Sequence, residues 1–274
     1  MPFSRCKFCG ENNLLSFPIV TRKKTLEYFQ CENCGAISLL DKCFLSHEQQ
    51  KERYVHHHNV LEDLGYAVFL ATFLRDCFSF LPNYSPQIVL DYGCGPNPAL
   101  IQLMQKVSAR QRSGGAGGMI EGSGSVDFQQ VGSLEQLVEL LAENLPPLPE
   151  PDCILGWDPF FSPEKSLAGR KASLVLCLEV AEHFEEPQEG FNGLAACCAE
   201  GGYVAVGTLP IPDSMNILEG FKGWWYKDDL THVSFYTEKA MTACGAASGL
   251  EYLGKASPRI FLFRKQGDAR DLFV

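Results

Sequence analysis

Short apolar runs alternate with amphipathic segments over most of this chain, and their order predicts its main elements. Runs bounded by turn residues predict buried strands, whereas an apolar period near 3.6 residues predicts helices. Strands are expected at 88–90, 153–157, 172–178, 203–209, 250–254 and 259–263, and helices at 99–104, 188–198 and 237–248. This alternation predicts an α/β fold in which helices cover both faces of a mostly parallel sheet.

Only Lys255, Ala256, Ser257 and Pro258 separate the last two expected strands. Parallel neighbours need a connection of about a dozen residues or more, whereas antiparallel neighbours can be joined by a tight turn. One strand of the sheet is therefore expected to run antiparallel to the others.

Two regions lie outside this alternation. Residues 47–84 are expected to be helical, because apolar side chains recur in them three or four positions apart. Residues 111–151 carry Gly/Ser-rich and Pro-rich stretches around one expected helix, 133–144, with Ser133 as its cap. We interpret 111–151 as an insertion after the first helix of the sheet, most of it a disordered surface loop.

Composition narrows the functional classes. The chain has 46% hydrophobic and 20% charged residues and a formal net charge of −10, values typical of an ordinary globular protein. The excess negative charge disfavours extensive contact with nucleic acid, and Arg22, Lys23 and Lys24 form the only compact basic patch. No apolar run is long enough to span a membrane and no signal-type stretch follows Met1, so a cytoplasmic location is expected.

Four cysteines near the amino terminus have the spacing of a metal site. Cys6 and Cys9 form one Cys-x-x-Cys pair, and Cys31 and Cys34 form a second one. Each pair can chelate a zinc ion, and two pairs complete its tetrahedron. We expect a zinc-ribbon-like domain over residues 1–45 whose metal is structural, because four thiolates leave no open coordination position.

The segment from Ile88 to Asn97 carries the most informative functional pattern. A strand leads into Asp91 and then into a Gly-x-Gly turn, Gly93 and Gly95, before a helix. Glycines let a ligand approach the backbone closely, and the helix start presents free N–H groups. The turn lacks the third glycine of the dinucleotide fingerprint. It resembles instead motif I of the class I S-adenosylmethionine (SAM) dependent methyltransferases, in which the first strand ends in Asp-x-Gly-x-Gly.

Further segments resemble this family in the same order. Asp158, in Trp-Asp-Pro-Phe-Phe after the second strand, matches the acid that accepts the ribose hydroxyls of SAM. Leu178 and Glu179 open a strand-end segment that reaches Glu182 and His183, similar to methyltransferases of quinone biosynthesis. The resemblance places Leu178 and Glu179 against the adenine and methionine parts of SAM, and implies mainly structural roles for Glu182 and His183.

Two segments are expected to act near the transferred methyl group. In many methyltransferases the helix before motif I carries a Tyr or His that closes over the methionine end, a role for Tyr54, His57 or Asn59 here. The consecutive histidines in that segment cannot share one metal ion, because neighbouring helical side chains diverge. Residues 224–236 match the family's substrate loop, where aromatic side chains would form an apolar wall and His232 would deprotonate the acceptor.

The chain is therefore identified as a SAM-dependent methyltransferase of the small quinone-methyltransferase-like group with an amino-terminal zinc domain. The resemblance implies a Rossmann-like seven-stranded sheet with its last strand antiparallel over residues 46–274. It implies SAM and Zn²⁺ as cofactors, a small-molecule acceptor and no membrane contact. Two alternatives stay open: a tRNA or rRNA methyltransferase that docks RNA on the zinc domain, and a non-catalytic module that binds SAM or a protein partner. The residues expected to bind SAM are Tyr54, His57, Asn59, Asp91, Gly93, Cys94, Gly95, Asp158, Pro159, Phe160, Leu178 and Glu179.

Overall fold

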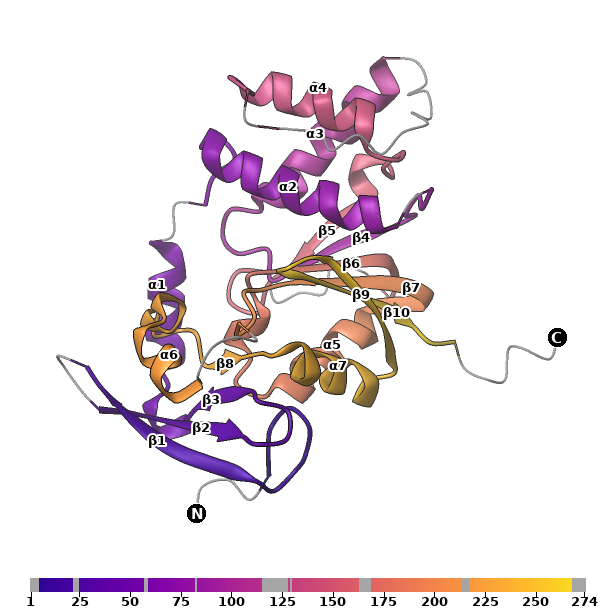
Figure 1. Ribbon diagram of the computed structural model, residues 1–274. Coiled ribbons are helices and arrows are strands. Elements are labelled where there is room, and N and C mark those ends of the chain that lie inside the picture. Colours follow the sequence, from indigo (N-terminus) through magenta and orange to yellow (C-terminus); the bar gives the residue numbers. More distant parts are fainter. Residues whose placement is uncertain are drawn as a thin grey trace.

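A six-stranded sheet covered by helices forms the centre of the molecule, and a smaller four-stranded sheet lies beside it (Figure 1). The computed structural model describes residues 5–21, 25–56, 59–81, 83–114, 128, 130–162, 169–212 and 217–267. The strands are β1 Leu14–Val20, β2 Thr25–Cys31, β3 Ile37–Leu39, β4 Val89–Tyr92, β5 Ile154–Trp157, β6 Ala172–Leu178, β7 Cys198–Gly207, β8 Ser234–Phe235, β9 Leu250–Ser257 and β10 Ile260–Lys265. The helices are α1 His47–Val55, α2 Leu64–Phe80, α3 Ala99–Ser113, α4 Leu134–Asn144, α5 Pro187–Cys197, α6 Ile217–Gly223 and α7 Glu238–Ala247. The 3₁₀ turns are η1 Asp41–Cys43, η2 Pro151–Cys153, η3 Ala181–His183 and η4 Trp225–Asp228.

The large sheet confirms the expected mixed α/β fold. Its strand order is β5-β4-β6-β7-β10-β9, and β4 pairs in parallel with β5 and β6. Strand β10 runs antiparallel to both β7 and β9, as the short connection before it predicted. Six strands are present in the described residues, where seven were expected. The connection between β5 and β6 forms only an isolated bridge, from Asp158 to Ser162, and its residues 163–168 lie outside the description.

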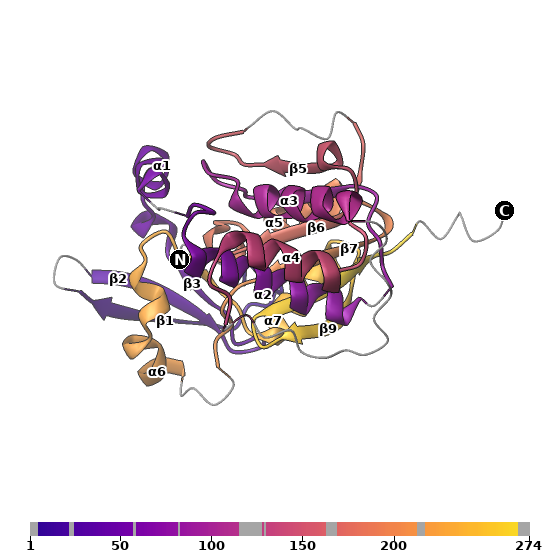
Figure 2. The ribbon, with the colours of Figure 1, turned by 90° about the horizontal axis from the view of Figure 1, so that it is seen from above.

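Helices cover both faces of the large sheet, as the alternating pattern predicted. Helices α2, α3 and α4 lie on one face, and α5 and α7 lie on the other (Figures 1 and 2). On α2 the side chains of Leu70, Phe73, Leu74 and Cys77 are buried at the spacing of one helical face. Burial of this stripe against the sheet removes apolar surface from water, at about 25 cal/mol for each Å².

Residues 47–84, expected to be helical, contain two separate helices. The side chain of Asp63 accepts a hydrogen bond from the backbone N–H of Tyr66 and so caps the start of α2. Residues such as Asp favour caps over helix interiors, because their side chains compete for backbone hydrogen bonds. The cap at Asp63 therefore begins a second helix, and the separate α1 lies beside the carboxyl ends of the central strands.

The insertion is a packed part of the core over residues 130–151, so the prediction of a largely disordered loop is wrong there. Leu137 and Leu141 of α4 are fully buried, and Leu145 and Leu148 join them in the cluster that contains α2 and α3. The side-chain amide of Gln111 binds the stretch that follows α4, since it donates to the carbonyls of Leu145 and Pro146 and accepts from the N–H of Leu148. Apolar spacing in the helix outweighs the flanking Gly and Pro content. Residues 115–127 and 129 lie outside the description.

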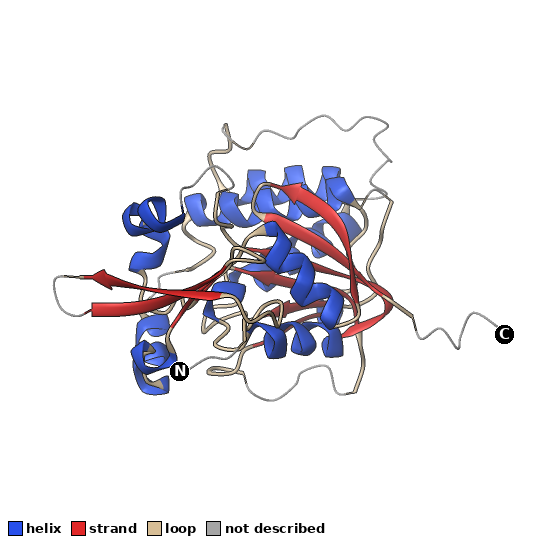
Figure 3. Ribbon diagram, turned by 60° about the horizontal axis from the view of Figure 1, so that its bottom comes forward, coloured by secondary structure: helices blue, strands red, loops and turns tan. Residues whose placement is uncertain are grey.

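The small sheet joins the amino-terminal residues to a distant part of the chain. Its order is β1-β2-β3-β8, and Ile37 and Ser38 of β3 pair with Phe235 and Ser234 of β8. The β1–β2 hairpin extends away from the large sheet (Figure 3). Residues 1–45 thus contribute three strands to a sheet that the carboxyl-terminal half completes. None of the described helices combines the length and apolar character that crossing a membrane requires.

Candidate active site

A cavity of about 1350 Å³ opens where β4, β5 and β6 end, and it is the setting of the candidate site. In open parallel sheets, ligands bind outside the carboxyl ends of the strands. Ligand pockets usually enclose about 300–1,000 Å³, so this space is sufficient for a nucleoside-sized molecule and a second ligand. The cavity is lined by the glycine turn after β4, the loop after β5, the end of β6, helix α1 and η1.

The two turn glycines are required for different reasons. Gly93 has a φ of +88°, and a Cβ on it would lie 2.5 Å from Cγ2 of Val180. Gly95 has a φ of +66°, but a Cβ on it would meet nothing within 4 Å. Both lie in the left-handed region that favours glycine. Gly93 is therefore required for packing, whereas Gly95 leaves an open approach to the backbone.

Replacement of Gly93 by alanine is expected to destabilise the protein more than the same change at Gly95. The left-handed backbone costs about 1–2 kcal/mol for alanine at either position. At Gly93 the new methyl group must also displace Val180, which typically adds about 1–3 kcal/mol. Urea unfolding of the two variants measures the difference, and equal losses would show that Val180 yields without cost.

Asp158 connects the glycine turn to the loop after β5. Its Oδ2 accepts a hydrogen bond from the backbone N–H of Gly95 at 3.0 Å. Its Oδ1 accepts from the N–H groups of Phe160 and Phe161 at 2.8 and 3.1 Å. The side chain is 6% exposed and lines the cavity. A carboxylate has about four lone-pair positions, so three backbone donors leave capacity for a ligand hydroxyl.

Two further carboxyl groups near the strand ends, those of Asp91 and Glu179, have raised pKa values. Burial, and then the charge of Asp158, raise the pKa of Asp91 to about 7. Burial and the charge of Glu182 likewise raise the pKa of Glu179 to about 7, against the opposing effect of Arg259, whose Nη2 lies 2.9 Å from Glu179 Oε1. Glu179 also has a positive φ of 52°, which is strained for a residue other than glycine. Strain and shifted pKa values of this kind are concentrated at functional sites.

Asp91 lies beneath the turn and its pKa makes stability depend on pH. The folded pKa near 7 exceeds the unfolded value near 3.8, so its contribution to stability is lost as pH rises between them. Asp91→Asn is expected to stabilise the protein at pH 8 by about 2–4 kcal/mol, at 1.36 kcal/mol for each pKa unit. Urea unfolding at pH 5 and pH 8 measures this, with the exposed Asp152→Asn as the control. The same pH dependence in wild type and Asp91→Asn would contradict it.

Two histidines and a carboxylate meet in the cavity beside Glu179, since the hydroxyl of Tyr226 lies 3.3 Å from Glu179 Oε2 and 2.7 Å from Glu182 Oε1. The Nδ1 of His183 lies 2.9 Å from the carbonyl oxygen of Thr231, and the Nδ1 of His232 lies 2.7 Å from that of Tyr226. Each Nδ1 therefore carries the proton that it donates, and Nε2 carries the lone pair. The side chain of Glu182 is completely buried beside them. Burial lowers the pKa of His232, which favours the neutral ring that a general base needs.

Helix α1 lines the cavity next to these residues. The ring of Tyr54 lies 5.3 Å from that of Phe160 and 5.4 Å from that of His183. Arg53 fixes the helix to the loop before β8, because its Nε and Nη2 each donate to Asp229 at 2.8 Å. Paired hydrogen bonds between a guanidinium and a carboxylate are geometrically specific.

The four amino-terminal cysteines converge as their spacing predicted. The Sγ atoms of Cys6 and Cys34 lie 3.7 Å apart, and those of Cys9 and Cys31 lie 3.6 Å apart. Zn–S bonds of about 2.3 Å in a tetrahedron place sulfurs about 3.8 Å apart. All four are free cysteines, and one ligand atom from each lies within 4.8 Å of the others. The donor set therefore fits a structural zinc ion.

A family model described as a methyltransferase domain matches residues 66–254. The chain belongs to this methyltransferase family. The match covers the glycine turn, Asp158 and the Glu182–His183 segment, and it confirms the resemblance to class I SAM-dependent methyltransferases. No curated protein matches the chain significantly.

Solved structures similar to this methyltransferase include other methyltransferases. An O-methyltransferase family protein from Burkholderia thailandensis is 14% identical, with a TM-score of 0.46 over 80% of this chain. This chain spans 63% of that protein. The N-methyltransferase NodS from Bradyrhizobium japonicum, in complex with S-adenosylhomocysteine (SAH), is 12% identical, with coverage of 80% and 98% and a TM-score of 0.41. Magnesium protoporphyrin IX methyltransferase from Synechocystis, with bound SAM, is 17% identical, with coverage of 81% and 92% and a TM-score of 0.37.

Most residues expected to bind SAM line this cavity. Asp91 is placed behind the turn instead of among the lining residues, and His57 lies outside the described residues. His232 lines the same cavity. The expected residues that line it are Tyr54, Asn59, Gly93, Cys94, Gly95, Asp158, Pro159, Phe160, Leu178 and Glu179.

The expected apolar wall from residues 224–236 is wrong. Among the described residues of that segment, His232 alone lines the cavity. Trp224, Tyr226 and Phe235 are buried in the core that joins β1, β2 and α6. The aromatic residues therefore attach the small sheet to the methyltransferase, and they leave only the histidine at the cavity.

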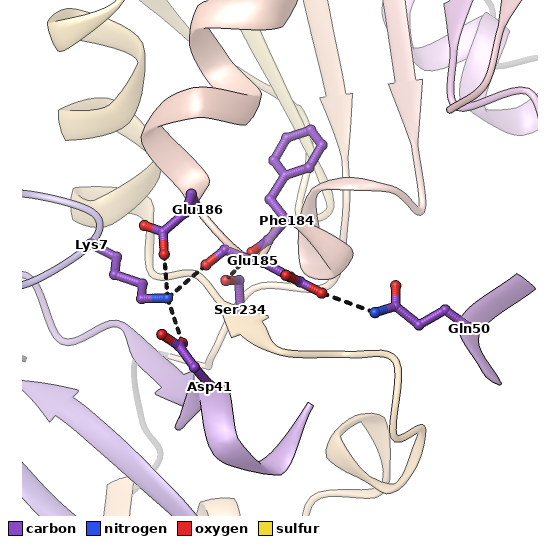
Figure 4. Close-up of polar contacts among 7 residues, drawn as sticks. All are labelled: Lys7, Asp41, Gln50, Phe184, Glu185, Glu186 and Ser234. Carbon is purple, nitrogen blue, oxygen red and sulfur yellow. Dashed lines mark hydrogen bonds and ion pairs between the residues drawn. The ribbon is translucent and has the colours of Figure 1, made fainter. Parts of the chain in front are cut away.

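The amino-terminal residues contribute to the cavity, which the sequence did not indicate. Asp41 and Gln50 line it together with Glu185 and Glu186 from the start of α5. Lys7 holds these parts together, since its Nζ contacts Asp41 at 2.7 Å, the carbonyl oxygen of Glu185 at 2.9 Å and Glu186 at 2.6 Å (Figure 4). Gln50 of α1 donates to Glu185 in the same cluster. Contacts among such distant segments leave no pattern in the sequence that could have revealed them.

Proposed function

We propose that this methyltransferase transfers the methyl group of SAM to a small molecule bound beside His183 and His232 in the cavity. The supporting observation is that one continuous cavity joins the glycine turn to His183 and His232 under the cover of α1. Two ligands bound in one covered space can be held in line for transfer, and alignment accounts for a large share of such catalysis.

The cofactor is proposed to lie against the ends of β4, β5 and β6. The backbone at Gly93 and Gly95 approaches the methionine part, and Asp158 accepts the ribose hydroxyls. Phe160 and Leu178 lie beside the adenine ring in this proposal. SAM supplies an electrophilic methyl group on a sulfonium; when the acceptor takes it, the S–C bond breaks and neutral SAH remains.

The acceptor loses a proton during transfer, and His232 is the proposed residue to receive it. Its Nδ1 is held by the carbonyl of Tyr226, so Nε2 provides the basic lone pair. Tyr54 and Asn59 of the covering segment exclude water from the methyl group.

A small-molecule acceptor is favoured over RNA by the charge of the cavity rim. Asp41, Glu185, Glu186 and Glu189 line the opening, and Lys7 lies against two of these carboxylates. Phosphate backbones bind proteins mainly through Lys and Arg, so an acidic rim opposes their entry. We propose that the zinc-held residues 1–45 serve as part of this rim and not as a docking site for RNA.

Methyl transfer from tritium-labelled SAM tests this proposal. The zinc-loaded protein is incubated with the small-molecule fraction and, separately, with the RNA fraction of a cell extract. Label is expected in the small molecules, and Asp158→Ala should abolish it. Label in the RNA fraction would support an RNA methyltransferase instead. If neither fraction were labelled and the protein still bound SAH, a non-catalytic SAM-binding module would be favoured.

A further inference from the structure

Glu182, His183 and His232 form a second cluster of metal-ligating side chains, apart from the four cysteines. One ligand atom from each of the three lies within 4.8 Å of the others. They come from two segments, the 3₁₀ turn η3 after β6 and the loop before β8, and all three line the cavity. The cluster therefore lies where the acceptor is proposed to bind.

The backbone orients both imidazole rings in the way that metal sites require. The Nδ1–H of His183 is directed to the carbonyl of Thr231, and that of His232 to the carbonyl of Tyr226. A histidine that binds a metal almost always donates its other ring N–H to such an acceptor, which fixes the tautomer and the ring orientation.

Hydrogen bonds also fix the carboxyl group of Glu182. Its Oε2 accepts from the hydroxyl of Thr208 and its Oε1 from that of Tyr226, both at 2.7 Å. Each oxygen keeps a further lone pair, because a carboxylate can accept about four hydrogen bonds. Supported carboxylates of this kind are typical of the shell around a metal.

The carboxyl group of Glu182 is buried without a Lys or Arg partner among the described residues. The side chain is 0% exposed, and among the residues that the structure describes no Lys or Arg forms an ion pair with it. The nearby guanidinium groups are engaged elsewhere, that of Arg53 with Asp229 and that of Arg259 with Glu179. Buried carboxylates are normally paired with a cation or bound to a metal.

We propose that Glu182, His183 and His232 bind one divalent transition-metal ion that receives a hydroxyl-bearing acceptor at its open position. Two imidazoles and one carboxylate are typical of catalytic sites for Zn²⁺ and its first-row neighbours, and unlike the oxygen-rich sites of Mg²⁺ and Ca²⁺. The inference rests on the proposed function and makes it more specific, because it selects oxygen as the methylated atom.

With the metal ion in place, deprotonation of the acceptor depends on metal coordination and no longer on the lone pair of His232. Coordination lowers the pKa of a bound hydroxyl, so its proton passes to solvent and the metal holds the alkoxide or phenoxide. That oxygen then forms the new O–CH₃ bond as the S–CH₃ bond of SAM breaks. Neutral SAH and the methyl ether leave, and the metal is unchanged.

Manganese binding tests the site without interference from the thiolates, which Mn²⁺ disfavours. Protein brought to one zinc per chain is titrated with Mn²⁺ alone, and free Mn²⁺ is followed by electron paramagnetic resonance. Wild type is expected to bind one Mn²⁺ per chain. His183→Ala, His232→Ala and Glu182→Gln should each weaken it at least tenfold. His56→Ala, at the exposed position that follows α1, should not.

Circular dichroism of the same samples shows whether each variant is folded. SAH titration shows whether its cofactor site is intact. No Mn²⁺ bound by wild type, or equal binding in both histidine variants, would overturn the metal site. If SAH still bound in that case, the proposed function would stand with His232 as the base. Metal binding without SAH binding would instead reject the proposed function on which the acceptor role depends.

Discussion

Replacing Asp158 with alanine is expected to weaken SAH binding by more than tenfold. A hydrogen bond to a charged group contributes about 1.5–3 kcal/mol, and each 1.4 kcal/mol is a factor of ten in affinity. The change also removes the acceptor for the N–H groups of Gly95, Phe160 and Phe161, so the turn and its neighbouring loop lose their connection. Calorimetric titration with SAH measures the loss.

Two control variants separate ligand contact from support of the turn. Asp158→Asn keeps one oxygen acceptor and removes the charge, so it should retain more affinity than Asp158→Ala if support of the turn dominates. Asp152→Ala, at an exposed position in η2, should bind SAH as wild type does. Unchanged affinity in Asp158→Ala would show that the ribose acid is a different residue.

Replacing Cys34 with serine is expected to produce the largest loss of stability. Structural zinc contributes about 10–16 kcal/mol to the folding of small zinc peptides, so loss of one ligand should lower stability by several kcal/mol. Cys6, Cys34 and Phe8 also pack in the same core as Tyr236 of the methyltransferase, where Phe8 meets Tyr236 edge to face at 5.1 Å. Thermal unfolding should therefore shift by about 10 °C or more, at roughly 2–4 °C for each kcal/mol.

Cofactor binding should largely survive this change, because the glycine turn and Asp158 belong to the large sheet. Methyl transfer should fall, since the rim residue Asp41 depends on the small sheet and Lys7. Cys43→Ser is the matched control, because Cys43 is half-buried and lies outside the four-cysteine group. If Cys34→Ser lost its affinity for SAH together with the zinc ion, the small sheet would have to form part of the cofactor site.

Local patterns sufficed to predict the strands of the large sheet and the cofactor turn. The run 172–178 forms β6 over the same residues, because an apolar stretch of that length has few alternatives to a buried strand. Gly93, Gly95 and Asp158 meet at the cavity because parallel strands place their carboxyl ends at one edge. Each prediction depended on chemistry contained within a few consecutive residues.

The parts that were missed depend on contacts between distant segments. The pairing of β3 with β8 joins residues about two hundred positions apart, and nothing in Ile37 or Phe235 specifies the partner. Glu182 and His183 were interpreted as mainly structural, because their nearness to His232 exists only after folding. The insertion was misjudged because Gly and Pro content was given more weight than the buried spacing of Leu137 and Leu141.

Calorimetric titration of the zinc-loaded wild-type protein with SAH tests the central claim most directly. The cavity at the ends of β4, β5 and β6 is expected to bind one SAH per chain, with a dissociation constant on the order of 1–100 μM, the lower part of the usual range for enzyme substrates. Binding at that level would establish the cofactor site and direct further work to the acceptor. Absence of binding by folded, zinc-loaded protein would contradict the account and leave the glycine turn as a purely architectural feature.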